Sequence, residues 1–465
     1  MDIVKTDSGD ISGIVLGDPG RGVNVYRGIP YAAPPIGDLR WKPPQPVIPW
    51  TGVRECSSYS KVAPQPRDPS NFTGEMPQSE DCLYLNVLTP AKRDSEKLPV
   101  MVWLHGGSFN MWSGNDRPYN QLWLPLKGVV LVNVNMRLGP IGLLAHTLLS
   151  QESPQGASGN YMFLDIIAAL KWVQKNIAEF GGNPDNVTIF GESGGSAKAV
   201  NLMASPLAKG LFHQAIGESG GGAGTRLEEM ESRGQRVFDK LGIEKEKNQL
   251  SAARAVPWEK IIEASQSVTD EMKIPLGPWD STVDGWFLPD TTANIFKAGK
   301  QNVIPFIMGA NLGELIGPTT ALPFLVASYV SLFKCANKVG GKAYAYIFDH
   351  LPAGWRKELA MAPHATEIPY VFGDMDGKSD IFSWLEFPLA RTFGSFTAKL
   401  TIDDSDRKVS ELMMDLWTNF AQKGNPSLEG VVEWPVWDEN TDQYLYITEL
   451  PEVRSRFSKI IEDQS

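Results

Sequence analysis

The chain has 465 residues, of which 42% are hydrophobic and 10% aromatic, so it is long enough to bury a large core. Its formal net charge of −11 and isoelectric point near 5.1 argue against nucleic acid as a partner, because phosphate binding requires a basic surface. No apolar run approaches the roughly 20 residues that span a bilayer, so a transmembrane protein is not expected.

Strands and helices alternate along most of the chain. The N-terminal part predicts short antiparallel strands at 11–16 and 23–26. Short apolar runs typical of buried parallel strands follow at 83–88, 100–104, 129–134, 187–190 and 303–308. Amphipathic helices are predicted at 163–177, with a glycine stop at Gly181-Gly182, and at 409–423, with a stop at Gly424. This order predicts an α/β fold with a mostly parallel central sheet flanked by helices.

The pentapeptide Gly-Glu-Ser-Gly-Gly occurs twice, at 191–195 and 217–221, and both copies match the G-x-S-x-G pattern of a nucleophilic serine on a tight turn. The first copy follows a strand-like run and leads into 196–204, which can sustain a helix. The second runs into further glycines, which disfavour a helix. Ser193 is therefore the predicted nucleophile, at the carboxyl end of a strand, where ligands bind in such sheets.

A serine nucleophile needs a histidine base and a carboxylate that orients it. In α/β folds with a G-x-S-x-G serine turn, the acid follows the serine in the chain and the histidine comes last, which leaves His350 and His364. His364 lies in a polar loop and is favoured, whereas His350 ends a strand-like run and suits a packing role. Glu314, just after the strand at 303–308, is the candidate acid, and an ordinary surface glutamate is the alternative for it.

The tetrahedral intermediate of such a reaction also needs hydrogen-bond donors for its oxyanion. The run His105-Gly106-Gly107-Ser108 follows the strand at 100–104, and its glycines let backbone N–H groups approach a substrate oxygen. Gly194, directly after the nucleophile, supplies another donor. The alternative is a plain glycine turn, but the later G-x-S-x-G motif favours an oxyanion hole.

With these motifs the sequence resembles the type-B carboxylesterase family, which includes cholinesterases and p-nitrobenzyl-type esterases. The resemblance runs nearly end to end, on YRGIPYAAPPIG at 26–37, SEDCLYLNV at 79–87, NMRLGP at 135–140, FGGNP at 180–184 and GNP at 424–426. It implies one α/β-hydrolase domain over 1–465, with helical cap-like insertions at roughly 225–300 and 315–340.

The resemblance also implies roles for single residues. Ser193, Glu314 and His364 match the catalytic triad of the family, and Gly107, Ser108 and Gly194 match the oxyanion donors. Ser219 matches a serine that supports the triad carboxylate. Two further pairs, Arg40 with Glu80 and Arg137 with Asp165, match ion pairs of the scaffold.

Departures from the family pattern are informative. Most relatives have glycine at the position of Ser108 and alanine at that of Gly194. The family disulfide joins the Cys82 position to one where this chain has Ala63, so Cys82 is expected to be unpaired, with Cys56 the remaining possible partner. Cys335 completes the set of three cysteines, which is too few for a disulfide scaffold and unlike a metal-ligand spacing.

We therefore expect a serine carboxylic-ester hydrolase that forms an acyl-enzyme, needs no metal or cofactor and acts on small-molecule esters. Only 50 positions separate Glu314 from His364, fewer than in typical relatives, which favours an open site for short- to medium-chain or bulky esters. Amide or carbamate hydrolysis and a non-catalytic adhesion protein are the alternatives. The N-terminus shows no secretory signal, so a cytoplasmic protein, monomeric or a small homo-oligomer, is expected.

Overall fold

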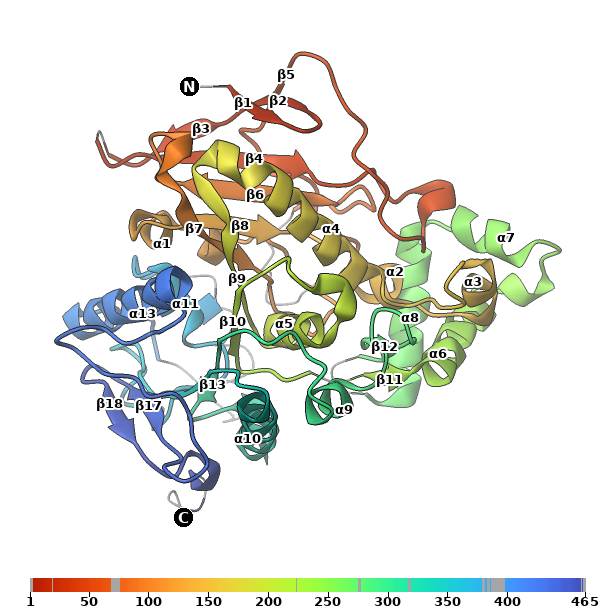
Figure 1. Ribbon diagram of the computed structural model, residues 1–465. Coiled ribbons are helices and arrows are strands. Elements are labelled where there is room, and N and C mark those ends of the chain that lie inside the picture. Colours follow the sequence, from red (N-terminus) through yellow and green to blue (C-terminus); the bar gives the residue numbers. More distant parts are fainter. Residues whose placement is uncertain are drawn as a thin grey trace.

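A mixed, mostly parallel sheet organises the computed structural model (Figure 1), which describes residues 3–18, 20–67, 76–222, 224–274, 277–316, 319–378, 381–382, 385, 398–460 and 462. Within these ranges the sheet has 11 strands, in the order β18-β17-β16-β13-β10-β9-β7-β8-β6-β4-β3. The strands from β17 to β8 are parallel, and β18, β6, β4 and β3 pair antiparallel at the two edges. In the order of the sheet, the strands are β18 (Glu452–Arg454), β17 (Tyr444–Ile447), β16 (Ala343–Phe348), β13 (Phe306–Asn311), β10 (Gln214–Glu218), β9 (Gly182–Glu192), β7 (Leu98–Trp103), β8 (Val130–Val134), β6 (Tyr84–Thr89), β4 (Val23–Pro30) and β3 (Ile14–Leu16).

Helices cover both faces of the sheet. Successive side chains of each central strand point to opposite faces, so each strand contributes to two hydrophobic clusters. In β7, Val100 and Val102 join one hydrophobic cluster, whereas Met101 and Trp103 join another. The first cluster lies under α4 (Tyr161–Asn176), α5 (Gly194–Ala204) and α10 (Leu322–Lys338). The second lies under α11 (Ile368–Phe372) and α13 (Asp404–Lys423), on the left of Figure 1. This arrangement is the α/β-hydrolase fold.

Smaller elements surround this core. A separate sheet near the N-terminus contains β1 (Val4–Thr6), β2 (Gly9–Ser12) and β5 (Val53–Glu55), and short pairs join β11 (Thr225–Arg226) to β12 (Thr282–Val283) and β14 (Leu315–Ile316) to β15 (Thr319–Thr320). The other α-helices of the described residues are α1 (Trp123–Leu126), α2 (Gly139–Leu143), α3 (Thr147–Glu152), α6 (Leu227–Lys240), α7 (Gln249–Ala255), α8 (Trp258–Met272) and α9 (Thr292–Lys297). Helices α6, α7 and α8 lie beyond one flank of the sheet, on the right of Figure 1.

The predicted elements are present, with shifted ends. The expected strand at 11–16 is two strands, β2 and β3, which break at Gly13, where an added Cβ would lie 2.4 Å from the Val25 carbonyl oxygen. The expected strand at 303–308 starts later, at Phe306. The glycine stops are confirmed, since Gly181 and Gly424 cap helical turns with φ of 77° and 66°.

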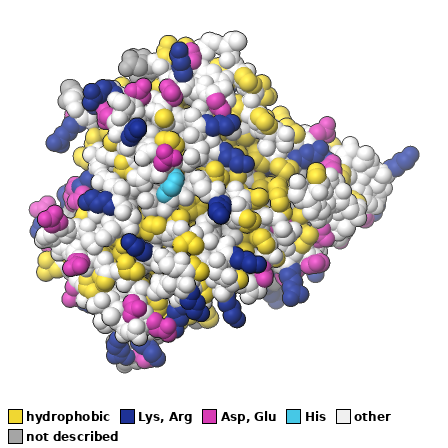
Figure 2. All heavy atoms as spheres, viewed as in Figure 1, with side chains coloured by type: hydrophobic (Ala, Val, Ile, Leu, Met, Phe, Trp, Pro, Cys, Tyr) yellow, Lys and Arg dark blue, Asp and Glu magenta, His cyan; other side chains and the backbone are white. Residues whose placement is uncertain are grey.

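Other properties of the described residues bear on the expectations. None of their helices is both long and apolar enough to cross a membrane. Cys56, Cys82 and Cys335 are free and buried, so the expectation of an unpaired Cys82 is confirmed. On the face in Figure 2, acidic and basic side chains are interspersed, and hydrophobic side chains gather beside the projecting lobe on the right.

Candidate active site

The two Gly-Glu-Ser-Gly-Gly copies lie side by side at the carboxyl ends of β9 and β10. The strands pair in parallel, with Glu192 opposite Glu218, so the repeated motifs are in register. The Ser193 N–H donates to the Glu218 carbonyl at 2.7 Å. Both Ser193 and Ser219 have a φ of 54°, which is unfavourable for a side chain with a Cβ. Each serine is thus held on a strained turn at the same edge of the sheet.

The chain after each serine distinguishes the two turns. Helix α5 begins directly after Ser193, whose side chain is partly exposed. After Ser219 the described residues contain no helix until α6, and the serine is only 4% exposed. Strand, strained serine and helix therefore follow one another only at Ser193, which is the geometry of a nucleophile elbow.

Glu314 and His364 lie together beside this elbow. His364 Nδ1 is 2.6 Å from Glu314 Oε2, and Glu314 Oε1 accepts the backbone N–H of Asn311 at 2.9 Å. The Gly313 N–H donates to the Ala362 carbonyl at 2.9 Å and so joins the two loops. Glu314 is fully buried, whereas the His364 side chain is 12% exposed. A buried acid that orients a partly exposed imidazole is the arrangement that a general base needs.

His350 has a different environment. Its Nε2 lies 2.8 Å from Asp406 Oδ1, and the Arg356 guanidinium and the Tyr370 hydroxyl contact the same Asp406 oxygen. This network ties the loop after β16 to the start of α13. His350 therefore has the packing role that the alternative assigned to it.

Glu192, which belongs to the first pentapeptide, is a further residue of the site that was not predicted from the sequence. Its Oε1 lies 3.1 Å from His364 Nε2, so the imidazole lies between two carboxylates. Burial raises the pKa of Glu192 well above its usual range. Burial lowers the pKa of His364, but the charges of Glu192 and Glu314 outweigh this and raise it to about 10. No hydrogen bond between His364 and the Ser193 hydroxyl is present among the described residues.

Ser219 contacts a carboxylate other than the expected one. Its hydroxyl donates to Glu367 Oε1 at 3.1 Å, not to Glu314. Glu367 Oε2 accepts from the Asn311 side chain at 2.5 Å, and the backbone of Asn311 donates to Glu314. Burial, followed by the Glu314 charge, raises the pKa of Glu367 to about 7. Any support from Ser219 to Glu314 therefore passes through Glu367 and Asn311.

Residues 105–109, which we call the oxyanion turn, face the start of α5. Gly107, Ser108 and Phe109 have φ of 82°, 49° and 64°, three successive residues in the left-handed region. A Cβ added at Gly194 would lie 2.9 Å from the Ser108 nitrogen, and one at Gly195 would lie 1.9 Å from the Leu104 carbonyl oxygen. The absence of a Cβ at both positions permits this close approach, which brings the predicted donors Gly107, Ser108 and Gly194 together.

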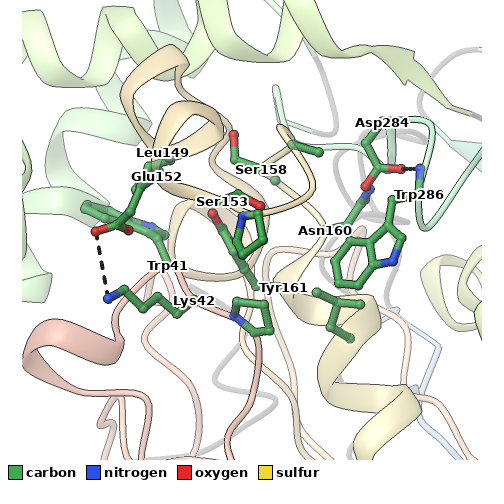
Figure 3. Close-up of a pocket in the computed structure, with 15 residues that line it drawn as sticks. Trp41, Lys42, Leu149, Glu152, Ser153, Ser158, Asn160, Tyr161, Asp284 and Trp286 are labelled. Atoms are coloured by element: carbon green, nitrogen blue, oxygen red, sulfur yellow. Dashed lines mark hydrogen bonds and ion pairs between the residues drawn. The ribbon is translucent and has the colours of Figure 1, made fainter.

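The neighbourhood of these residues opens to solvent, since Ser108, Ser193 and His364 are each partly exposed. A separate cavity of about 190 Å³ is lined by none of the candidate catalytic residues. Figure 3 shows its aromatic walls, Trp41 and Trp286, and the Lys42–Glu152 ion pair at 3.8 Å. No group of three or more His, Cys, Asp or Glu side chains within the described ranges is arranged to hold a metal ion.

The expected scaffold ion pairs are present. The side chains of Arg137 and Asp165 are both 0% exposed and form two hydrogen bonds with each other, at 2.6 and 2.8 Å. Arg40 contacts Glu80 in the same bidentate way, at 2.5 and 2.6 Å. Because each buried charge has an opposite partner, these pairs are compatible with a folded interior.

The chain matches known proteins over almost its whole length. The profile described as "Carboxylesterase family" matches residues 1–323 and 319–461. The chain is 33% identical to a para-nitrobenzyl esterase of Bacillus subtilis, over 96% of this chain and 94% of that protein. It is 34% identical to a fumonisin B1 esterase of Sphingopyxis macrogoltabida (92% and 83%) and 31% identical to a human cocaine esterase (97% and 88%). Among solved structures, a PNB esterase superposes with a TM-score of 0.82 at 30% identity, covering 97% of this chain and 96% of the other. The chain therefore belongs to the carboxylesterase family and is a carboxylic ester hydrolase.

Proposed function

We propose that this protein hydrolyses esters through Ser193, His364 and Glu314 and an acyl-enzyme on Ser193. The observation that carries the proposal is the 2.6 Å contact between His364 and the buried Glu314, beside a serine on a strained strand-to-helix turn. Each group has the environment its role requires. The serine and the histidine reach solvent, and the acid does not.

In the proposed reaction, His364 Nε2 takes the proton of the Ser193 hydroxyl as the serine oxygen attacks the ester carbonyl. The N–H groups of Gly107, Ser108 and Gly194 donate to the oxyanion that forms. His364 then protonates the leaving alcohol, and water repeats the sequence on the acyl group. In the structure His364 Nε2 faces Glu192, the residue before Ser193. For the first step the imidazole of His364 must therefore turn its Nε2 from Glu192 towards the Ser193 hydroxyl.

We further propose that short- to medium-chain or bulky esters are the substrates. The relatives are named for para-nitrobenzyl, fumonisin B1 and cocaine substrates, which differ from one another. The short segment between Glu314 and His364 supports an open site, within a single domain that carries cap-like insertions at roughly 225–300 and 315–340. Amides and carbamates would require the same groups, so p-nitroanilides and carbamates belong in the substrate panel.

Ser193→Ala and Ser219→Ala test the proposal as a matched pair, because the two serines occupy the same place in the repeated pentapeptide. With p-nitrophenyl acetate and butyrate, Ser193→Ala should lower kcat by about 10⁴-fold or more. Ser219→Ala should retain most of the activity, since its hydroxyl contacts Glu367 in the interior. Retained activity in Ser193→Ala with loss in Ser219→Ala would mean that the nucleophile is wrongly assigned.

A further inference from the structure

Lys198 is a buried lysine without a carboxylate partner. It lies in α5 and is 0% exposed. Within the described part of the chain, the other Lys or Arg residues buried as a whole are Arg40 and Arg137, and each forms an ion pair. Burial alone lowers the pKa of Lys198 to about 7, with no carboxylate to oppose it. Burying an unpaired ammonium is costly, so its position calls for a reason other than stability.

The contacts of Lys198 are with the oxyanion turn. Its Nζ donates to the His105 carbonyl at 2.7 Å, at the start of the turn. At the other end of the turn, the Phe109 ring centroid lies 5.6 Å from the same ammonium, within the range of cation–π attraction. One side chain thus touches both ends of a five-residue segment that contains three successive residues with positive φ.

Helix α5 makes this contact possible and also carries the nucleophile. Gly195 packs against the backbone of Leu104 and His105, where a Cβ would lie 3.1 Å from the His105 oxygen. Lys198 is three residues further on, so it projects from the same face of the helix. The oxyanion turn is therefore held against α5 at two places. Gly195 packs against it near the start of the helix, and Lys198 contacts it three residues further on.

We infer that Lys198 is a positioning residue whose hold on the His105 carbonyl keeps the N–H groups of Gly107 and Ser108 directed at the carbonyl oxygen of an ester on Ser193. The inference rests on the proposed function for its catalytic consequence. The left-handed turn has strained φ values, and a strained segment persists only when surrounding contacts hold it. Lys198 supplies such a contact at the first residue of the turn.

The test compares Lys198→Met, which keeps the length and loses the donor, with Lys198→Gln, which keeps a donor without the charge. Lys209→Met is the control, because Lys209 is exposed just beyond the same helix. With p-nitrophenyl butyrate, Lys198→Met should lower kcat by about 10- to 100-fold, the scale of a small misplacement of catalytic groups. KM should change little, Lys198→Gln should be intermediate, and Lys209→Met should match the wild type.

Two further measurements separate positioning from general damage. The thermal midpoint of Lys198→Met should equal or exceed that of the wild type, because the variant removes a buried amine whose charged form is disfavoured by burial. Amide hydrogen exchange over 105–109 should become faster in Lys198→Met and stay unchanged in Lys209→Met. Wild-type kcat in Lys198→Met, unchanged exchange over the turn, or a lowered midpoint alongside lost activity would overturn the inference. If the wild type itself hydrolysed no ester, the proposed function would fail, and the exchange measurement would still decide whether Lys198 holds the turn.

Discussion

Replacing Glu192 with glutamine should move the acid limb of the pH profile of kcat/KM to lower pH. Glu192 Oε1 lies 3.1 Å from His364 Nε2, and the glutamate is fully buried. A general base must be neutral to accept a proton, and a neighbouring carboxylate favours the charged imidazolium. Removing the carboxylate charge should therefore let the base form at a lower pH.

The size of the shift follows from the geometry around His364. Burial lowers its pKa, and the charges of Glu192 and Glu314 raise it to about 10. An opposite charge within 4–6 Å shifts a pKa by about 1–3 units, so Glu192→Gln should lower the limb by about that much. Each unit corresponds to about 1.4 kcal/mol. Because burial raises the pKa of Glu192 itself, the variant and the wild type should converge at low pH, where Glu192 is protonated.

Hydrolysis of ethyl butyrate, followed in a pH-stat from about pH 5 to 11, measures the profile without a chromophoric leaving group that titrates in this range. Glu218→Gln is the matched control, because Glu218 occupies the same place in the second pentapeptide and its carboxylate accepts from the Trp417 indole at 2.8 Å. Its limb should stay close to that of the wild type. An unchanged limb in Glu192→Gln, or an equal shift in both variants, would refute the reasoning.

Three other predictions concern the scaffold, the oxyanion hole and the substrate range. Asp165→Asn leaves Arg137 buried beside a neutral group, so it should lower the free energy of unfolding, measured in urea, by about 3–5 kcal/mol. Glu263→Gln is the control at the exposed Lys260–Glu263 pair and should leave that free energy nearly unchanged. Gly194→Ala would place a Cβ 2.9 Å from the Ser108 nitrogen and should lower kcat by about tenfold. Ser108→Gly combined with Gly194→Ala should recover part of that loss, because glycine adapts to the positive φ. No recovery would mean that the two positions are independent. An open site should accept acyl chains longer than acetyl with similar kcat/KM, and a sharp preference for acetyl would contradict openness.

The sequence predicted the elements that depend on local patterns. Buried strands such as β7 and β8 are short apolar runs, and the helix stops at Gly181 and Gly424 need residues that accept positive φ. The ends were less predictable, because they depend on packing. Gly13 lies between β2 and β3 and closely approaches the Val25 carbonyl, a contact that no local pattern encodes.

The candidate site was predicted where chain order restricts the choice. The order of serine, acid and histidine left two histidines, and the structure places His364, not His350, beside Glu314. Contacts between distant segments were not predictable from the pattern. Neither the contact of Glu192 with His364 nor that of Lys198 with His105 follows from helix or strand periodicity. The first depends on how the end of β9 packs against the loop that carries His364, and the second on how α5 packs against the oxyanion turn.

Labelling with diethyl p-nitrophenyl phosphate tests the central claim most directly, because this reagent forms a stable adduct on an activated serine and releases one p-nitrophenol. The account predicts one equivalent of p-nitrophenol and one diethylphosphoryl group per chain, located by peptide mass spectrometry on Ser193. His364→Ala should slow the labelling greatly, because the serine then lacks its base. An adduct on Ser219, or an unlabelled chain that still hydrolyses esters, would contradict the account.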